Sequence, residues 1–490
     1  MMASARNITR LLELQSSTIE KIENIKGTGP GGLPNGERWI SLHDVFHYLY
    51  KNTQRLPEKR IWKPVSCFEK RKDAKNLWDH QKNAVNSCYT KDGFVSGNIE
   101  MDCGTGKTLV GCELIRLSGK PCMVITPHVI SSKQWVDELK SYTNINVKTK
   151  DEISKSWKND NSPFPDVIVC TYSSITRAFK GISDKECNED TILWLYIIKN
   201  FGLLLLDEVH LAPADQFRLS CLLNYSTIIG FSGSLIREDQ KISHLNNIVG
   251  PVLYTHTHGK KVTYILTTVP KSNIYENINV KSRSKHDYTL RTLNPNKMAA
   301  LREFLNMDEY KNSRMVVFCD SAIAVKYIEI LFDTISSRKC CGVLNGLTSE
   351  IHRQNILKNF SEMDGSALIT TSVCNIAVNL PSDCIVIQVH NSNGSRCQEM
   401  QRCGRSGRGE ALEMTIIHIV NECTEEEKFY KHRSDHMKLH YGDNFNNYEH
   451  KWSGNVLETD SNPIKTYIKD IENTKPVHQD RYSKLRKVLK

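Results

Sequence analysis

Short runs of apolar residues recur along most of the chain, and stretches with helical periodicity separate them. Between residues 75 and 250, four such runs lie at 122–126, 167–171, 203–206 and 228–232. Between residues 296 and 425, three more lie at 315–319, 367–371 and 385–389. A short apolar run bounded by polar residues is typical of a parallel strand buried on both faces. Strands that alternate with helices form parallel sheets, so the pattern predicts an α/β fold with two parallel-sheet lobes in tandem.

The polar segments around these runs predict how the chain is divided. We expect an N-terminal extension of unassigned role at 1–70, a first lobe at 75–250 and a second lobe at 296–425. Residues 251–295 are irregular and polar, which favours a linker between the lobes. Residues 426–490 are charged and poor in apolar side chains, which predicts a solvated tail.

The most informative motif is the segment Met-Asp-Cys-Gly-Thr-Gly-Lys-Thr at 101–108, which follows Ile99 and Glu100 and precedes a helix-like run at 109–117. Such a loop can wrap its backbone N–H groups around nucleotide phosphates at the start of a helix. Lys107 is suited to neutralise the β- and γ-phosphates, and Thr108 to offer its hydroxyl to Mg²⁺. The remaining residues that we assign to the phosphate cradle are Cys103, Gly104, Thr105 and Gly106.

Two carboxylates, Asp207 and Glu208, follow the apolar run at 203–206. Open α/β sheets bind their ligands at the carboxyl ends of the strands. We therefore expect Asp207 to hold Mg²⁺ and Glu208 to orient and deprotonate the attacking water. An isolated pair of this kind could equally be a solvated acidic turn, and the phosphate loop upstream argues against that alternative. We assign His210 to coupling of the metal site to lobe closure rather than to metal binding.

A third motif, Gln-Arg-Cys-Gly-Arg-Ser-Gly-Arg at 401–408, lies in the second predicted lobe. Arginines three residues apart share one face of a helix or turn. Arg405 and Arg408 could stabilise charge on a transferred phosphoryl group, with Gln401 beside the nucleotide or the water. A basic surface loop is the alternative for any single arginine pair, and the spacing behind the first two motifs favours the catalytic interpretation.

Together these motifs resemble those of superfamily 2 helicases and translocases, which have two RecA-like lobes. The segment 77–81 lies where such proteins carry a glutamine near the adenine, which implies this role for Gln81. A more specific resemblance, over about residues 75–425, is to the XPB family, the DNA translocases of the transcription and repair factor TFIIH. It rests on Asp-Glu-Val-His at 207–210, on Leu-Ile-Arg-Glu-Asp at 235–239, and on the segments 293–297 and 379–401.

The resemblance implies further site residues. Nucleic-acid contacts are expected at Thr126, Trp135, Thr171, Tyr172, Arg237, Glu238, Asp239 and Thr370. For Trp135, on a predicted helix, packing inside the lobe is favoured over stacking on a base. Ser232 and Ser234 would couple hydrolysis to nucleic-acid contact, with Gly233 replacing the alanine that usually separates these hydroxyls. Because the family carries a small thumb near 251–295, a thumb-like insertion is the alternative to a linker there.

The resemblance also implies ATP and Mg²⁺ as cofactors and duplex or forked DNA as the partner, with RNA and subunits of transcription or repair complexes as further candidates. The implied function is that of an ATP-dependent DNA helicase or double-stranded DNA translocase with 3′ to 5′ polarity. It would act in transcription, repair or viral nucleic-acid metabolism, since the short segment before residue 75 favours a compact viral relative. An RNA helicase and a non-catalytic scaffold subunit are the alternatives.

Composition narrows the compartment and the class of partner. No apolar run approaches the ~20 residues needed to cross a bilayer, and the N-terminus lacks the apolar core of a signal peptide. The 16 cysteines include no C-x-x-C pair, which disfavours a zinc ribbon and favours reduced thiols. We therefore expect a nuclear or cytoplasmic protein, or one in a viral factory, that is not secreted. The net charge of +10 fits a polyanionic partner.

Overall fold

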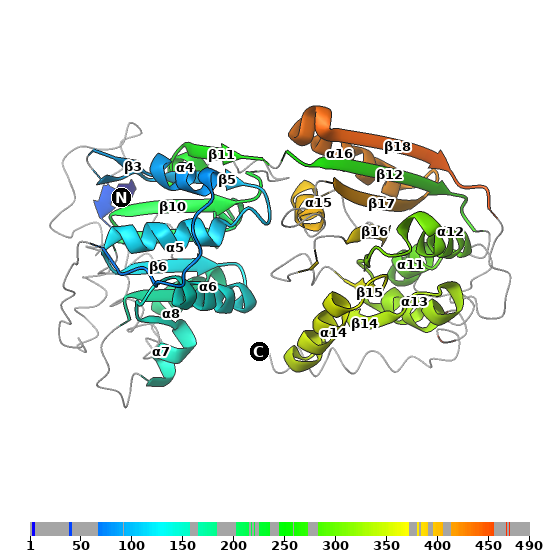
Figure 1. The fold of residues 1–490 in the computed structure, drawn as a ribbon, viewed down its shortest axis with the longest axis horizontal. Coiled ribbons are helices and arrows are strands. Elements are labelled where there is room, and N and C mark those ends of the chain that lie inside the picture. The colour runs from blue at the N-terminus through cyan, green and yellow to red at the C-terminus, as the bar shows by residue number, and fades with distance from the viewer. Residues whose placement is uncertain are drawn as a thin grey trace. The chain divides into compact units, whose positions relative to one another are not determined.

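The computed structural model contains two compact units, formed by residues Met1–His258 and Gly259–Lys490 (Figure 1). The residues that the structure describes are 2–4, 39–41, 67–91, 93–156, 165–183, 202–214, 217, 220, 225–235, 245–257, 259–272, 283–371, 380–381, 384–390, 395–404, 413–454, 467 and 470. Each unit is built around one seven-stranded sheet.

The sheet of the first unit has the order β11-β5-β10-β9-β6-β8-β7, and its neighbouring strands are parallel. Its strands are β5 (Gly97–Met101), β6 (Cys122–Thr126), β7 (Val147–Thr149), β8 (Val167–Thr171), β9 (Leu203–Asp207), β10 (Thr227–Ser232) and β11 (Val252–His256). The helices are α4 (Asp79–Ser87), α5 (Lys107–Ser118), α6 (Val129–Tyr142), α7 (Lys150–Ser156), α8 (Tyr172–Ser183) and α10 (Leu245–Ile248). Two short antiparallel pairs accompany them, β1 (Met2–Ser4) with β2 (Trp39–Ser41) and β3 (Tyr89–Thr90) with β4 (Gly93–Phe94).

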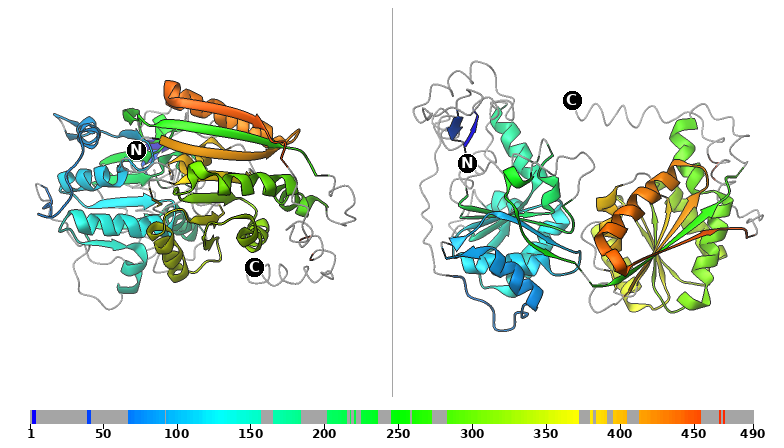
Figure 2. Two further views of the ribbon diagram at one scale, coloured as in Figure 1. Left: turned by 45° about the vertical axis from the view of Figure 1, so that its right-hand side comes forward. Right: turned by 90° about the horizontal axis from the view of Figure 1, so that it is seen from above.

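The sheet of the second unit has the order β14-β15-β13-β16-β17-β12-β18 and is also parallel. Its strands are β12 (Lys261–Val269), β13 (Met315–Cys319), β14 (Cys340–Leu344), β15 (Ala367–Thr370), β16 (Ile385–His390), β17 (Glu413–Asn421) and β18 (Phe445–Lys451). The helices are α11 (Arg283–Thr292), α12 (Pro295–Asn306), α13 (Ala322–Ile335), α14 (Glu350–Glu362), α15 (Arg396–Cys403) and α16 (Glu425–Tyr441). In both units, helices cover the two faces of the sheet (Figure 2).

The period-two pattern of the strands divides the second unit into two cores. On β13, Met315 and Val317 join the core that α11, α12 and α13 cover, whereas Val316 and Phe318 join the core under α14, α15 and α16. Burial on both faces explains why the strands read as continuous apolar runs. The helices begin at capping residues: the side chains of Ser321, Ser349, Ser395 and Thr424 each accept a hydrogen bond from a backbone N–H of the first turn.

The predicted α/β fold is confirmed, and each of the seven predicted apolar runs corresponds to a strand, namely β6, β8, β9, β10, β13, β15 and β16. Two predicted segment assignments were wrong. Part of the expected linker or thumb at 251–295 lies inside the sheets, because β11 pairs with β5 and β12 pairs along nine residues with β17. Part of the expected tail at 426–490 also belongs to the fold, because β18 pairs with β12 and α16 buries Tyr430 and Met437.

Among the residues that the structure describes, no helix is both long enough and apolar enough to cross a membrane.

Candidate functional site

The loop at 102–106 connects β5 to α5 and forms a tight cradle. Gly104 and Gly106 both have φ of +86°, a left-handed conformation that glycine adopts without strain. At Gly106, a Cβ would lie 2.2 Å from the side-chain nitrogen of Gln81, so only glycine fits against that neighbour. Inside the loop, the buried Thr105 hydroxyl donates to the carbonyl of Asp102 at 2.7 Å. Thr105 thus stabilises the loop from within.

Lys107 and Thr108 stand at the first turn of α5, whose backbone N–H groups favour anions. The Lys107 ammonium donates to the carbonyls of Met101 and Asp102, at 2.8 and 3.2 Å. The carbonyls of the loop therefore hold the Lys107 ammonium at the N-terminus of α5. This combination of a positive side chain and free helix N–H groups suits a polyphosphate.

Gln81 on α4 secures the loop from behind. Its amide nitrogen donates to the carbonyl of Thr105 at 2.9 Å, and its amide oxygen accepts from the backbone N–H of Trp78 at 2.9 Å. The His80 ring also contacts the Thr105 carbonyl, with Nε2 at 3.0 Å. Both ends of the Gln81 amide are thus used within the protein, and adenine contact by Gln81 stays a prediction.

The two carboxylates stand where β9 ends. Burial, and then the neighbouring charge of Glu208, raise the pKa of Asp207 to about 7, while the indole of Trp135 and the charge of Lys107 oppose the increase. Glu208 is one of two non-glycine residues with positive φ among those described, at φ 49° and ψ 54°. A strained backbone at a carboxylate is a common feature of functional sites.

These groups fit Mg²⁺, which is usually bound by one or two carboxylates together with substrate phosphates and water. Asp207 and Glu208 repel each other at a half-buried site, and a divalent cation would relieve that repulsion. No group of three or more His, Cys, Asp or Glu side chains among the described residues could form an all-protein metal cage. The site therefore suits a cation that arrives with a nucleotide.

His210 links the carboxylates to the turn after β10. Its Nδ1 lies 2.9 Å from the hydroxyl of Ser232 and 3.4 Å from a carboxylate oxygen of Glu208. The Ser232 hydroxyl in turn donates to the carbonyl of Ser234 at 2.6 Å. At Gly233, between the two serines, a Cβ would lie only 3.1 Å from the sulfur of Cys103. The turn 232–234 therefore contacts both the phosphate loop and, through His210, Glu208.

The side chains of Trp135 and Tyr172 are both buried and bond to Asp207, which supports the packing interpretation of Trp135, and their contacts with nucleic acid stay predictions. The Trp135 indole donates to the Asp207 carboxylate at 3.1 Å, and the Tyr172 hydroxyl donates to the Asp207 carbonyl at 3.0 Å. The hydroxyls of Thr126 and Thr171 likewise lie within hydrogen-bonding distance of Ser132 and Ser174.

Thr370 ends β15 in the second unit and is fully buried, with its hydroxyl donating to the carbonyl of Leu344 at 3.1 Å. Any contact of the three predicted threonines Thr126, Thr171 and Thr370 with nucleic acid would have to use the backbone. The predicted contacts at Arg237, Glu238 and Asp239 lie outside the described residues.

In the second unit, α15 carries Gln401, whereas Arg405 and Arg408 lie outside the described residues. Sequence reasoning missed the buried charges that anchor this helix. Arg402 bonds to Asp320 at the end of β13 and to Gln388 on β16. Glu399 accepts from Arg433 of α16 at 3.1 Å and from the hydroxyl of Tyr264 on β12 at 2.6 Å. Only the period of the helix, which turns 399 and 402 to one side, could have indicated them.

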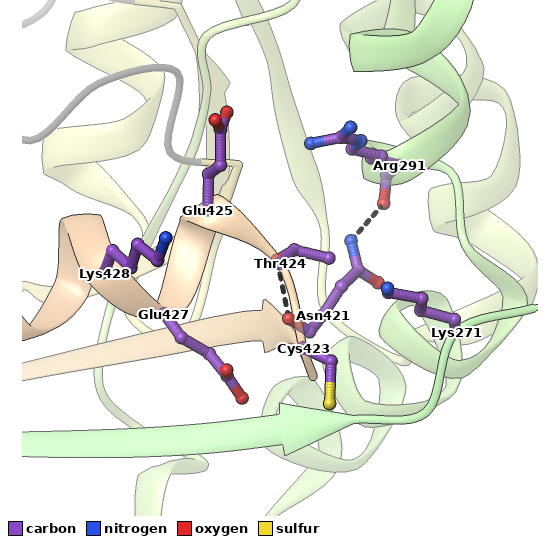
Figure 3. Close-up of a pocket in the computed structure, with 8 residues that line it drawn as sticks. All are labelled: Lys271, Arg291, Asn421, Cys423, Thr424, Glu425, Glu427 and Lys428. Atoms are coloured by element: carbon purple, nitrogen blue, oxygen red, sulfur yellow. Dashed lines mark hydrogen bonds between the residues drawn. The ribbon is translucent and has the colours of Figure 1, made fainter.

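A pocket of about 620 Å³ opens elsewhere in the second unit, where α16 begins (Figure 3). It is lined by Lys271, Arg291, Asn421, Cys423, Thr424, Glu425, Glu427 and Lys428. The Asn421 amide donates to the carbonyl of Arg291, and the Thr424 hydroxyl to the carbonyl of Asn421. These bonds stay within the protein, and the lining includes none of the sequence-predicted site residues, so we assign the pocket no role.

Comparison with known proteins places this site in context. Residues 261–448 match the ERCC3/RAD25/XPB C-terminal helicase family, and residues 74–237 match the type III restriction enzyme res subunit family. The chain is 28% identical over 339 residues to the general transcription and DNA repair factor IIH helicase/translocase subunit XPB of Encephalitozoon cuniculi (strain GB-M1), covering 66% of this chain and 48% of that protein. The protein of the same name from Danio rerio is also 28% identical over 339 residues, covering 67% and 42%. The chain thus spans about half the length of these relatives, or less.

Among solved structures, the fold is similar to S. cerevisiae Dbp5 bound to RNA and ADP BeF3. The TM-score is 0.53 at 14% sequence identity, and the match covers 80% of this chain and 92% of the other. This likeness concerns the fold alone, and it confirms the prediction of two RecA-like lobes in tandem.

Proposed function

We propose that the protein is an ATP-driven motor that moves on double-stranded DNA, on the premise that residues 74–237 match the type III restriction enzyme res subunit family and residues 261–448 the ERCC3/RAD25/XPB C-terminal helicase family. The observation that carries the proposal is the arrangement around β9 and β5. A phosphate loop with its lysine and a half-buried carboxylate pair interact electrostatically at the carboxyl edge of one sheet. Such an arrangement suits phosphoryl transfer from a nucleoside triphosphate, and with Glu208 placed to activate water it supports hydrolysis.

In this mechanism, the loop amides and Lys107 bind the β- and γ-phosphates, and Thr108 and Asp207 would hold Mg²⁺. The cation would neutralise charge on the phosphates. Glu208 orients a water and takes its proton. The left-handed backbone at Glu208 fixes the direction from which its carboxylate approaches that water. His210 lies between Glu208 and the Ser232 hydroxyl, so a change in the position of Glu208 is transmitted through His210 to the turn 232–234.

The second lobe would complete the site. We assign Arg405 and Arg408 to the phosphoryl group during transfer and Gln401 to the nucleotide or the water. The buried anchors of α15 support this assignment, because Glu399 and Arg402 fix the helix that leads into the arginines. Closing and opening of the lobes would then move the protein along a nucleic-acid backbone.

We base the proposed substrate on the relatives, which are named as helicase/translocase subunits of a general transcription and DNA repair factor. We propose duplex or forked DNA as the substrate and 3′ to 5′ movement along it. We also propose that the protein associates with other transcription or repair subunits in the compartment that holds the DNA. Phosphate contacts by backbone groups would carry little base specificity.

The decisive experiment measures ATP hydrolysis by the purified protein alone and with double-stranded DNA, single-stranded DNA or RNA. Glu208→Gln serves as the inactive variant, and Glu362→Gln, at an exposed position on α14, as its matched control. We expect stimulation by DNA in the native protein and in the control, and a loss of about 10²-fold or more in Glu208→Gln.

Two outcomes would replace the proposal. Stimulation by RNA alone would make the protein an RNA helicase. Equal hydrolysis by native protein and Glu208→Gln, or none with any nucleic acid, would favour a scaffold subunit that retains the fold.

A further inference from the structure

The side chain of Trp135 is almost fully buried, and its indole nitrogen bonds to the Asp207 carboxylate. Trp135 is on α6, and only 2% of it is exposed. Its indole N–H donates to Oδ2 of Asp207 at 3.1 Å. An indole nitrogen is a donor without acceptor capacity, so this bond persists only while the carboxylate oxygen faces it.

The ring has little freedom to leave this position, because a glycine on α5 makes room for it. A Cβ at Gly111 would lie 2.4 Å from Cη2 and 2.8 Å from Cζ3 of Trp135. On another side, the ring of Phe231 on β10 lies with its centroid 6.3 Å away, tilted by 50°. The indole is thus fixed between α5, which begins with Lys107 and Thr108, and the strands that carry the acidic residues.

Asp207 receives a second aromatic donor from a different helix. The hydroxyl of Tyr172, at the start of α8, donates to the Asp207 carbonyl at 3.0 Å. One donor therefore restrains the backbone of Asp207 and the other its carboxylate. Partners that hydrogen-bond to a metal-binding carboxylate orient it and commonly change metal affinity by 10- to 100-fold when removed.

We propose that Trp135 is a positioning residue of the Mg²⁺ site, where its indole N–H holds the Asp207 carboxylate in the orientation that binds Mg²⁺ together with the nucleotide. The inference rests on the proposed function, since it assigns Asp207 to the cation. It also gives α6 a role in the nucleotide site that the sequence did not indicate.

The test is Trp135→Phe, which keeps an aromatic ring in the space and removes only the donor and the outer part of the ring. Binding of a non-hydrolysable ATP analogue is measured by calorimetry at increasing Mg²⁺ and, separately, in excess EDTA. We expect the Mg²⁺ concentration for half-maximal binding to rise about tenfold or more. In EDTA, the affinity should be unchanged, and high Mg²⁺ should restore the hydrolysis rate.

The chain provides a matched control on the same helix. Tyr142 is equally buried, and its hydroxyl donates to the Glu113 carboxylate at 2.9 Å. Tyr142→Phe therefore removes an aromatic hydrogen bond to a carboxylate without touching Asp207. It should lower the melting temperature and leave the Mg²⁺ dependence as in the native protein.

A second variant separates packing from positioning. Gly111→Ala forces the indole to move while Trp135 is retained, and it should raise the Mg²⁺ requirement as Trp135→Phe does. In the double variant Gly111→Ala/Trp135→Phe, the smaller ring makes room for the methyl group. We expect the double variant to melt at a higher temperature than Gly111→Ala and to keep the high Mg²⁺ requirement.

An unchanged Mg²⁺ requirement in Trp135→Phe or in Gly111→Ala, with only the melting temperature lowered, would reduce Trp135 to a packing residue and overturn the proposal. Failure of the native protein to bind the analogue with Mg²⁺ would instead remove the proposed function and this inference with it. The two failures are therefore distinguishable.

Discussion

At the scale of single residues, Asp207 and Glu208 oppose each other electrostatically. Two adjacent carboxylates stand at the end of β9, and burial and mutual repulsion raise the pKa of Asp207 to about 7. A site built to receive a cation is electrostatically unfavourable while it is empty, so function here opposes stability.

This tension gives a pH-dependent prediction for Asp207→Asn. Because the folded-state pKa of Asp207 is raised, the unfolded chain releases this proton at lower pH than the native protein does. The group therefore removes stability as pH rises from about 4 to about 7. Without Mg²⁺ and nucleotide, we expect Asp207→Asn to be more stable than the native protein. Its advantage should be about 2 kcal/mol larger at pH 8 than at pH 5.5, at roughly 1.4 kcal/mol per pKa unit.

Denaturant unfolding at the two pH values measures this difference. Asp364→Asn is the control, because the Asp364 side chain is 78% exposed. A stability difference between native protein and Asp207→Asn that does not change with pH would contradict the prediction.

At the scale of elements, the turn 232–234 packs against the phosphate loop, with Gly233 facing the side chain of Cys103. A methyl group at Gly233 would come within 3.1 Å of the Cys103 sulfur and 3.6 Å of the Lys107 ammonium. Gly233 replaces the more usual alanine of this turn, and Cys103 occupies the space that the glycine leaves.

We therefore predict that Gly233→Ala destabilises the first unit by about 1 kcal/mol through overpacking and lowers kcat for ATP. Cys103→Ala removes the sulfur, so the double variant Cys103→Ala/Gly233→Ala should regain most of the lost activity. A double-mutant cycle on kcat/KM and on melting temperature measures the coupling. Strict additivity of the two substitutions would show that the contact carries no energy.

A buried ion pair ties α12 to α16 in the second unit. The Lys297 ammonium donates to both oxygens of Glu426 and to the carbonyl of Val389, and Lys297 and Glu426 are almost fully buried. Lys297→Met would leave an unpaired charge inside the core, so we expect a loss of about 3–5 kcal/mol.

The pair Lys261–Glu413 between β12 and β17 is the comparison, since its side chains are 54% and 63% exposed. Lys261→Met should change the free energy of unfolding by less than about 1 kcal/mol. Chemical denaturation of both variants measures the contrast, and equal losses would contradict it.

The same contrast between exposed and buried positions explains what the sequence could predict. The strands β6, β8 and β13 were predictable because every residue in them is buried and all but the terminal threonines of β6 and β8 are apolar. The strand β18 was not, because it lies at the sheet edge, most of its residues are exposed, and it contains few apolar side chains.

The site divides in the same way. The phosphate loop and the acidic pair were predictable because consecutive residues supply their chemistry. The bond from Trp135 to Asp207 joins residues 72 positions apart, and that from Arg402 to Asp320 joins residues 82 apart. A single sequence gives no sign of such pairings, which is why Trp135 was assigned to nucleic acid and Arg402 was overlooked.

At the scale of the whole molecule, the chain passes from one sheet to the other within residues 257–260, between the end of β11 and the start of β12. The last strand of the first sheet and the first strand of the second sheet therefore flank the boundary between the units. Each unit has its own hydrophobic core. Domains with separate cores can unfold separately.

The second unit should depend on residues beyond the predicted lobe boundary at 425. A chain ending at residue 425 lacks α16 and β18, so β12 becomes an edge strand and Lys297 loses Glu426, its buried partner. An unpaired buried charge costs about 3–5 kcal/mol, and loss of the buried Tyr430 and Met437 side chains adds about 2–5 kcal/mol each. Together these losses match or exceed the ~5–15 kcal/mol of a typical domain.

We therefore expect the chain 1–425 to keep a folded first unit and an unfolded second unit, whereas the chain 1–472 should keep both. The longer form retains Tyr467, which is buried in the second core, and Asp470, which accepts from the Tyr327 hydroxyl. Limited proteolysis should reduce 1–425 to a fragment that ends near residue 258 and still binds an ATP analogue, while 1–472 should yield two resistant fragments. A protease-resistant second unit in 1–425 would contradict this prediction, because it would show that the second unit folds without α16 and β18. The position of α15, which leads into Arg405 and Arg408, would then depend on no residue beyond 425.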